Sequence, residues 1–406
     1  MNIFRSRPIL TSSLTLLVLL TCSYHFLTRV GLDLSILVGL AGLIVCLSLI
    51  KEVKIFLAHS LEDPRKNISI LCILFFSFAG IIFHLENTWK EIGLFGFLFF
   101  SIYLILRNQD TNLNNFIANL MICSGVFMSI GVLIGLFEYL FFSSNLFYHI
   151  ITGYPYMDQR VVFSGFEFNY NFSAYIIIVA QSFLFLSTSV FMKNLRTVLT
   201  VLFLLALLVT SAKIVVLFIS LVVCNYFIKD KIKKNLLNII LIALYLLASH
   251  IVIAFHDSYE LGSVHYRELL FSIGDIDFVL GNYGYLKAAY FIELKDNFFL
   301  PANLKDITQT LNADPHSLIY SLIILGGFPL AFSVFILIVK GIYKNFRIIV
   351  ERYPSYYFCG LISVITETFV WDANNSIFFW IIILYAITIS KDSYPSNTRA
   401  RISINE

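Results

Sequence analysis

The fold depends most on the stretch VLTVLFLLALLVT-SAK-IVVLFISLVVCNYF, which covers Val198–Phe227. Two apolar runs meet here at Ser211-Ala212-Lys213, with only three residues between them. If the runs formed one continuous helix, every later segment would lie on the opposite side of a membrane. We expect two separate helices, because this division gives the more consistent distribution of basic residues described below.

The rest of the chain repeats this apolar pattern. Hydrophobic residues make up 59% of the 406 residues and charged residues 13%, with a mean hydropathy of +0.84. A membrane-crossing helix needs about 20 apolar residues, and the chain offers about twelve such runs. The predicted fold class is therefore all-α, a polytopic integral membrane protein that forms a single membrane domain over residues 1–406. The predicted spans are Leu10–Phe26, Leu34–Ile50, Ile68–Phe83, Ile92–Leu106, Phe116–Leu140, Phe172–Phe191, Val198–Thr210, Ile214–Phe227, Leu236–Phe255, Ile319–Val339, Tyr356–Phe369 and Ile377–Ile389.

Basic residues predict the orientation of these spans. With twelve spans and a cytoplasmic N-terminus, about 20 of the 28 Lys and Arg residues lie on the cytoplasmic side, as membrane topology favours. Both termini are then cytoplasmic, and the long polar loop 256–315 between spans nine and ten lies outside. The net charge of +3 comes mostly from cytoplasmic flanks, so it does not indicate nucleic-acid binding. All six cysteines fall in apolar runs, which predicts no disulfide framework.

The outer loop 256–315 is far longer than an ordinary connection, which marks it as a candidate functional segment. Within it, Tyr266–Asp275 has apolar residues at helical spacing, so we expect a short amphipathic helix that holds Arg267 at the membrane surface. Gly281–Gly284 predicts a turn, and Ala289–Leu294 predicts a second short helix. His316 follows Asp314 and Pro315, a good N-cap and first helical residue, which places it at an anion-attracting helix start.

Four potentially cationic groups share the outer side: Arg160, Lys213, Arg267 and His316. Arginine binds phosphate oxygens in bidentate fashion and stays charged, which suits a diphosphate leaving group. Each residue taken alone has a simpler explanation. An arginine near a helix end is usually a membrane anchor, a histidine at a helix start is usually a structural cap, and Lys213 could simply close a tight hairpin.

Three acidic residues complete the candidates. Glu138 lies inside the fifth span, where an ionisable residue is a functional candidate by default, although its position near the outer end would let it reach water. Glu367 and Asp372 flank Trp371 and are either polar residues at helix ends or contacts to an acceptor molecule.

The chain resembles the O-antigen ligase and polymerase superfamily of bacterial envelopes over roughly residues 160–330. The resemblance rests on Arg160 with Phe163–Asn171 and Ala174, on Thr210–Lys213, on Arg267 through Gly281–Gly284, and on Pro315-His316-Ser317 followed by Gly326-Gly327. Two positions depart from the family pattern. Ala212-Lys213 stands where members often carry Ser-Arg, which keeps the charge but loses the bidentate geometry. Ser317 stands where the histidine is commonly followed by Asn.

The resemblance implies an inverting glycosyltransferase of the bacterial inner membrane that uses neither metal nor other cofactor. Its donor would be an undecaprenyl-diphosphate-linked glycan, and its active site would face the periplasm. The acceptor would be the lipid A-core in a ligase, or a second lipid-linked glycan in a polymerase. The helix start at His316 and the Glu367–Asp372 turn favour the ligase.

In this mechanism Arg160, Lys213 and Arg267 bind the diphosphate. His316 joins them as imidazolium or acts as base on the acceptor hydroxyl, since imidazole titrates in the right range for both roles. Two other classes of function remain open. A transporter or flippase for lipid-linked oligosaccharide would also have twelve spans, but its site should lie near the membrane midplane. A non-catalytic scaffold would leave the outer cations unexplained.

Overall fold

We describe a computed structural model of the 406-residue chain. The structure describes residues 8–32, 35–62, 64–83, 89–107, 111–142, 145–154, 157–167, 169–186, 190–255, 268–280, 282–295, 298–302, 317–352, 355–368 and 376–388.

The described chain is mainly helical, as predicted, and every predicted apolar run overlaps a helix. The helices are α1 (Pro8–Arg29), α2 (Ser35–Ser48), α3 (Ile50–Glu62), α4 (Pro64–Phe83), α5 (Trp89–Arg107), α6 (Thr111–Phe141), α7 (Tyr170–Leu184), α8 (Val190–Thr210), α9 (Lys213–Phe227), α10 (Lys231–His250), α11 (Asn282–Leu294), α13 (Leu318–Arg352), α14 (Ser355–Glu367) and α15 (Ile377–Thr388).

Three stretches of described helix are long and apolar enough to cross a membrane: Leu113–Phe141, Lys231–His250 and Leu318–Asn345. Several other helices, among them α7, α9 and α15, are apolar but shorter. A membrane protein is therefore plausible, while twelve spans and their orientation remain predictions.

The break between α8 and α9 is confirmed. Ser211 follows the last residue of α8 with φ 57°, a left-handed conformation that costs a non-glycine residue roughly 1–2 kcal/mol. The chain then leaves in a new direction, since α8 packs on α6 and α7 whereas α9 packs mainly on α14 and α10. Lys213 thus begins a helix with different neighbours, and it does not close a tight helical hairpin.

The described part of the chain also contains five short strands, which were not predicted. β1 (Tyr148–Tyr154) and β2 (Met157–Phe163) form an antiparallel hairpin, and β3 (Ile251–Phe255), β4 (Glu268–Ile273) and β5 (Ile276–Leu280) form a sheet with the order β3-β5-β4. The amphipathic helix expected over Tyr266–Asp275 is wrong, because its described part is β4 and the following turn. β3 likewise replaces the end of the ninth predicted span.

The second short helix of the outer loop is confirmed but begins earlier. It is α11, which already includes Asn282, Tyr283 and Gly284, so the turn expected over Gly281–Gly284 is a helix over its described residues. Gly281 itself lies outside the described residues.

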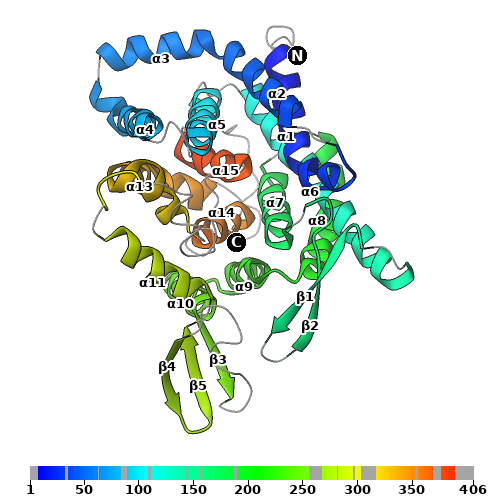
Figure 1. Cartoon of the computed structure of the whole chain (residues 1–406). Coiled ribbons are helices and arrows are strands. Elements are labelled where there is room, and N and C mark those ends of the chain that lie inside the picture. The colour runs from blue at the N-terminus through cyan, green and yellow to red at the C-terminus, as the bar shows by residue number, and fades with distance from the viewer. Residues whose placement is uncertain are drawn as a thin grey trace.

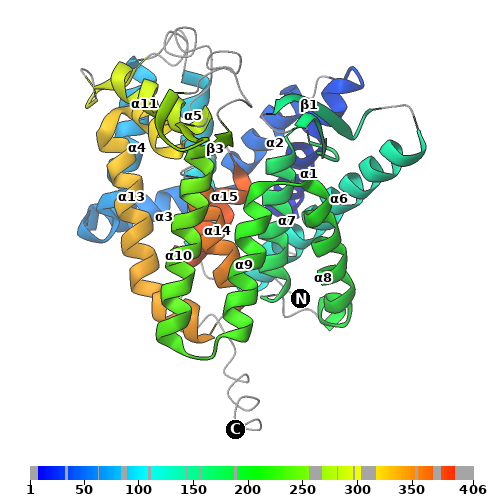
Figure 2. The same cartoon turned by 90° about the horizontal axis from the view of Figure 1, so that it is seen from below.

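The helices stand roughly side by side, so that many are seen end-on in Figure 1 and from the side in Figure 2. α7 and α15 lie at the centre, and most residues of each are buried. β1, β3 and α11 gather at one end of the bundle in Figure 2, while the α9–α10 connection lies at the other end. We call the end with the strands and α11 the strand end.

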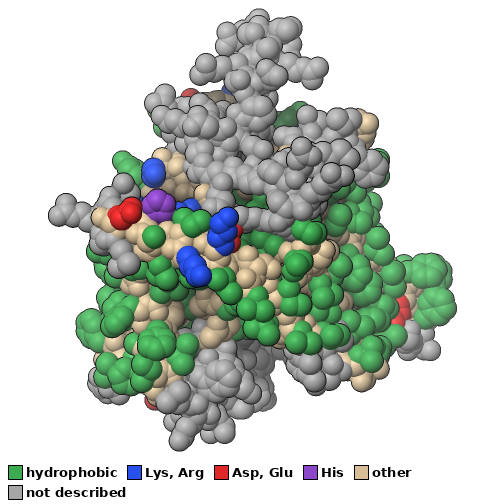
Figure 3. Space-filling model, turned by 90° about the horizontal axis from the view of Figure 1, so that it is seen from above, with side chains coloured by type: hydrophobic (Ala, Val, Ile, Leu, Met, Phe, Trp, Pro, Cys, Tyr) green, Lys and Arg blue, Asp and Glu red, His purple; other side chains and the backbone are tan. Residues whose placement is uncertain are grey.

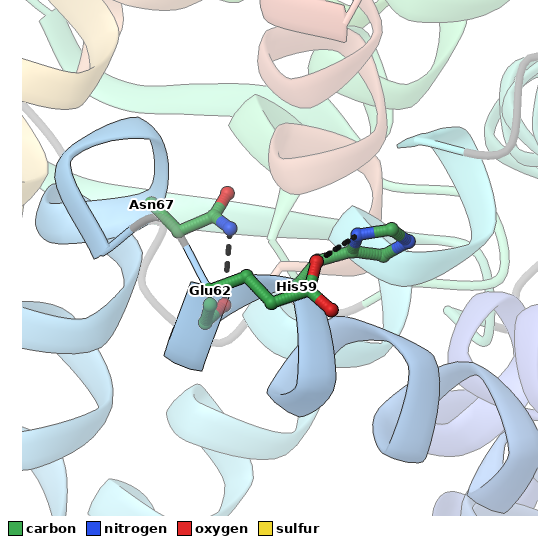
Figure 4. A network of polar contacts seen from close by, with 4 residues as sticks. His59, Glu62 and Asn67 are labelled. Atoms are coloured by element: carbon green, nitrogen blue, oxygen red, sulfur yellow. Dashed lines mark hydrogen bonds and ion pairs between the residues drawn. The ribbon is translucent and has the colours of Figure 1, made fainter.

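α3 runs across the ends of its neighbours, in the plane of Figure 1. On the side of the molecule that carries it, charged and histidine side chains gather above a broad hydrophobic belt (Figure 3). Near its end, His59 lies 3.7 Å from Glu62, and Asn67 of α4 donates to the Ser60 hydroxyl at 3.0 Å (Figure 4). The hydrogen bond from Asn67 to Ser60 joins α3 to α4 at this polar corner.

α13 is broken at Gly326 and Gly327, and a second segment of the chain fills the break. Gly327 has φ 73° and ψ 175°, a conformation open in practice only to glycine. Phe328 N–H, freed by the break, donates to the Phe298 carbonyl at 2.9 Å, and Ala302 N–H donates to the Ile324 carbonyl at 2.9 Å. The break at Gly326-Gly327 therefore holds residues 298–302 of the 256–315 loop against α13.

Candidate functional site

Arg160 reaches the start of α9 from the second strand of the hairpin. Its Nη2 donates to the carbonyl oxygen of Ser211, and its guanidinium lies 5.4 Å from the centre of the Tyr170 ring. Ser211, whose carbonyl accepts this bond, has a left-handed backbone conformation. Such outliers often mark functional positions. Arg160 and Lys213, two of the four predicted cations, are thereby brought to one place.

The segment 163–171 explains how Arg160 is held. Gly165 has φ +60° and packs so tightly on α6 that a Cβ there would lie 2.8 Å from the Val132 nitrogen. The Ser173 hydroxyl donates to the Ser164 carbonyl at 2.6 Å, and the Asn169 side chain caps α7. These local contacts fix the connection from β2 to α7, which carries Arg160 and Tyr170 at its two ends.

Glu367 is the buried acid of this region. It is the last residue of α14, has an exposed fraction of 5%, and accepts a hydrogen bond from the hydroxyl of Tyr245 on α10 through Oε2. Lys213 and Lys287 both attract its carboxylate. A buried carboxylate is tolerable only when it is hydrogen-bonded and faces positive charge, and Glu367 has both.

Lys287 and His250 form the other side of the cluster. Lys287 Nζ, on α11, lies 2.5 Å from His250 Nε2 at the end of α10, and His250 Nδ1 lies 2.6 Å from the Leu246 carbonyl. This arrangement fits an imidazole that donates from Nδ1 and accepts at Nε2. Burial lowers the pKa of Lys287 from its usual 10.5 to about 8, although the charge of Glu367 acts in the opposite direction.

The start of α13 joins the same region. Leu318 N–H donates to the carbonyl of Thr368, the residue after Glu367, at 3.0 Å, and Ser317 is buried with an exposed fraction of 3%. His316 directly precedes these residues in sequence, but it lies outside the described residues. Arg267, Trp371 and Asp372 do as well, so the structure tests none of these four predicted positions.

Glu138 has a structural role, and the expectation that it reaches water is wrong. Its exposed fraction is 5%, and its two carboxylate oxygens accept the backbone N–H groups of Leu146 and Phe147 at 2.8 and 2.9 Å. The Phe147 carbonyl in turn accepts the N–H groups of Ser164 and Gly165 at 3.2 and 3.0 Å. Glu138 therefore fixes the entry into the hairpin that carries Arg160.

Sequence reasoning did not identify Tyr245, His250 and Lys287. A signal was present for His250, because a histidine inside an apolar run is uncommon and often functional. No comparable signal marked Tyr245 among 22 tyrosines, or Lys287 within a polar loop. Their partners come from other helices, which only the tertiary structure identifies.

The described cluster thus contains Arg160, Lys213, Lys287, His250, Tyr245 and Glu367, and we call it the strand-end cluster. In this cluster, lysine and arginine side chains that can bind an anion lie near histidine, tyrosine and glutamate side chains that can exchange a proton. α9 adds to this character, because its N-cap residue Ala212 makes no side-chain cap hydrogen bond and helix starts attract anions. In comparisons with known proteins, no family model, no curated protein and no solved structure matches this chain.

Proposed function

We propose that this protein is a membrane glycosyltransferase that moves a glycan from a polyprenyl diphosphate to an acceptor hydroxyl at the strand end of the helical bundle. The observation that carries the proposal is the meeting of Arg160 with the Ser211–Lys213 turn, next to the buried carboxylate of Glu367. The diphosphate already carries two negative charges and gains a third when its bond to the glycan breaks, and pre-placed cations stabilise this developing charge.

Each group has a defined role in this proposal. Arg160 and Lys213, together with Arg267 from the outer loop, bind the diphosphate. His316 either accepts the proton of the acceptor hydroxyl or binds the diphosphate as imidazolium. Glu367 holds Lys213 and Lys287 in place by its charge, and Tyr245 orients Glu367 through its hydroxyl.

The position of the cluster favours transfer over transport. Lys213 begins α9, His250 ends α10 and Glu367 ends α14, so the cluster lies at helix ends. A transporter for lipid-linked glycan would place its binding groups near the middle of the spans. A protein of this kind would lie in a bacterial inner membrane with the strand end facing the periplasm.

The test is a transfer assay with an undecaprenyl-diphosphate-linked glycan in reconstituted vesicles. Arg160→Ala removes charged hydrogen bonds worth about 1.5–3 kcal/mol each, so we expect turnover to fall about 10- to 100-fold. Lys295→Ala is the matched control, because Lys295 is an exposed cation directly after α11, and it should leave turnover unchanged. Near wild-type turnover of inserted Arg160→Ala would overturn the proposal, and translocation without transfer would favour a flippase.

The acceptor is tested separately, by the lipopolysaccharide banding pattern of a deletion strain. We propose ligation to the lipid A-core, for which loss leaves uncapped core and accumulated lipid-linked polymer. Core that carries a single repeat unit would identify the polymerase instead.

A further inference from the structure

The sheet β3-β5-β4 has two unlike faces. Asp277 and Val279 of the central strand lie on one face, with exposed fractions of 2% and 1%, and the Ser272 hydroxyl donates to Asp277 Oδ1 at 2.5 Å. The register places Phe271, Ile273, Ile276 and Phe278 on the opposite face, since Phe271 pairs with Phe278 and Ile273 with Ile276. The protein therefore covers the central strand on the face that carries the aspartate.

The opposite face is apolar and open. Phe271 is 50% exposed, Ile273 63% and Ile276 37%, and the rings of Phe271 and Phe278 stack with their centres 4.5 Å apart. Leu270, the extra residue of the bulge in the edge strand, is also exposed, by 44%. A sheet with one face in water normally carries polar residues there, so contiguous apolar side chains indicate a partner surface.

The position of the sheet identifies that partner. β3 begins directly after His250, the last residue of α10, and α10 is one of the three helices able to cross a membrane. The three strands lie side by side and project past α10, away from the bundle, in the view in which the helices are seen end-on (Figure 1). In Figure 2 the sheet is at the end of α10. The sheet therefore projects into the region beside α10 that lipid would occupy.

The apolar surface of the sheet continues that of α10. Ile239, Leu244 and Leu247 are 63%, 55% and 55% exposed, and only 17% of the apolar window of α10 is buried within the protein. Exposed apolar side chains in this number on a helix long enough to cross a membrane suit contact with lipid. Because β3 follows α10 without an intervening loop, the two open apolar surfaces share one environment.

We propose that the apolar face of Phe271, Ile273, Ile276 and Phe278 rests in the outer leaflet of the membrane, at the boundary between headgroups and acyl chains. The inference rests on the membrane embedding of α10 in the proposed function. Amphipathic helices that lie in the membrane surface bury their apolar side about 5–10 Å into the boundary between headgroups and acyl chains, and the open face of the sheet would do the same. Since β5 leads into α11, which carries Lys287, docking of the sheet sets the height of Lys287 relative to the membrane surface.

Site-specific photocrosslinking in native membranes tests the proposal. The photoreactive residue p-benzoylphenylalanine is introduced at position Phe271 or Ile273, and adducts are identified by mass spectrometry after illumination. We expect phospholipid adducts at both positions. The matched control is position Ser272, which is exposed on the same strand but shares the face of Asp277, and it should give no lipid adduct.

A second control separates the two proposals. Position Leu244 on α10 reports the membrane embedding itself. Lipid adducts at Leu244 without any at Phe271 and Ile273 would overturn the docking of the sheet and leave the embedding intact. A crosslinked dimer at Phe271 would overturn the proposal in favour of a second copy of the chain. Loss of lipid adducts at Leu244 as well would overturn the embedding and, with it, this inference.

Discussion

Glu367→Gln offers the most direct test of the strand-end cluster. The substitution keeps the size of the side chain and its ability to accept from the Tyr245 hydroxyl, and it removes one negative charge. Lys287 has a pKa of about 8, which results from burial that lowers it and from Glu367 that raises it. Without the charge of Glu367, burial acts with less opposition, so the pKa of Lys287 must fall.

The size of the effect follows from general values. An opposite charge close by typically shifts a pKa by about 1–3 units, and Lys287 is partly open to water, so we expect a fall near the lower limit, about 1 unit. At pH 7 a lysine with a pKa of about 8 is about 90% protonated, and with a pKa of about 7 it is about half protonated. In the variant, a much larger fraction of Lys287 should therefore be unprotonated, and so open to acylation, at neutral pH.

The assay is the pH dependence of Lys287 acylation by a small reagent, followed by mass spectrometry of the peptide from α11. Glu293→Gln is the matched control, because Glu293 lies exposed on the same helix and should leave the profile of Lys287 unchanged. A pKa of Lys287 that stays the same or rises in Glu367→Gln would refute the reasoning, since α11 and α14 would then not bring these two charges together.

The remaining predictions concern stability, measured as thermal unfolding in detergent. In Glu138→Gln, an amide N–H₂ faces one of the two backbone N–H groups whose hydrogen bonds the carboxylate accepts. We expect the free energy of unfolding to fall by about 1–3 kcal/mol. An unchanged melting temperature would contradict this structural role of Glu138. Gly327 has a backbone conformation open in practice only to glycine, and Gly327→Ala would place a Cβ 2.3 Å from the Phe299 carbonyl oxygen. This substitution should lower the free energy of unfolding by more than about 2 kcal/mol. Gly39→Ala is the control, because Gly39 has open space around it and its substitution should leave stability unchanged. Lys287→Met should stabilise the protein at neutral pH. The unfolded chain binds more protons at Lys287 than the native protein between pH about 8 and 10.5, so wild-type stability rises through this window. The advantage of the variant should shrink there, and a pH-independent advantage would exclude the pKa shift as its cause.

Much of the helical framework could be predicted because it depends on local composition. Each apolar run from Leu10–Phe26 to Ile377–Ile389 overlaps a helix, and the expected break is present as Ser211 and Ala212 between α8 and α9. The strands could not be predicted in the same way. Leu269, Leu270 and Ile273 have a spacing that fits a helix, but in the structure the bulge between Leu269 and Phe271 changes their register along an edge strand.

The candidate site was only partly predictable, for the same reason. Arg160 and Lys213 were identified because the predicted topology places few basic residues on the outer side. Glu138 was assigned to the wrong environment, because nothing in the sequence indicates that the turn at Leu146 and Phe147 folds back onto it. Arg267 and His316, the residues with the strongest sequence signal, stay predictions.

The sequence by itself determined that this chain forms apolar helices with short connections, because burying a backbone away from water requires each run to satisfy its own hydrogen bonds. The tertiary structure alone decided which polar groups meet. Arg160 and Ser211, Lys287 and His250, and Tyr245 and Glu367 are separated by 51, 37 and 122 residues in the chain. Such contacts depend on how α7, α9, α10, α11 and α14 pack against one another, and side-chain packing between helices has no signature in the local sequence of any one of them.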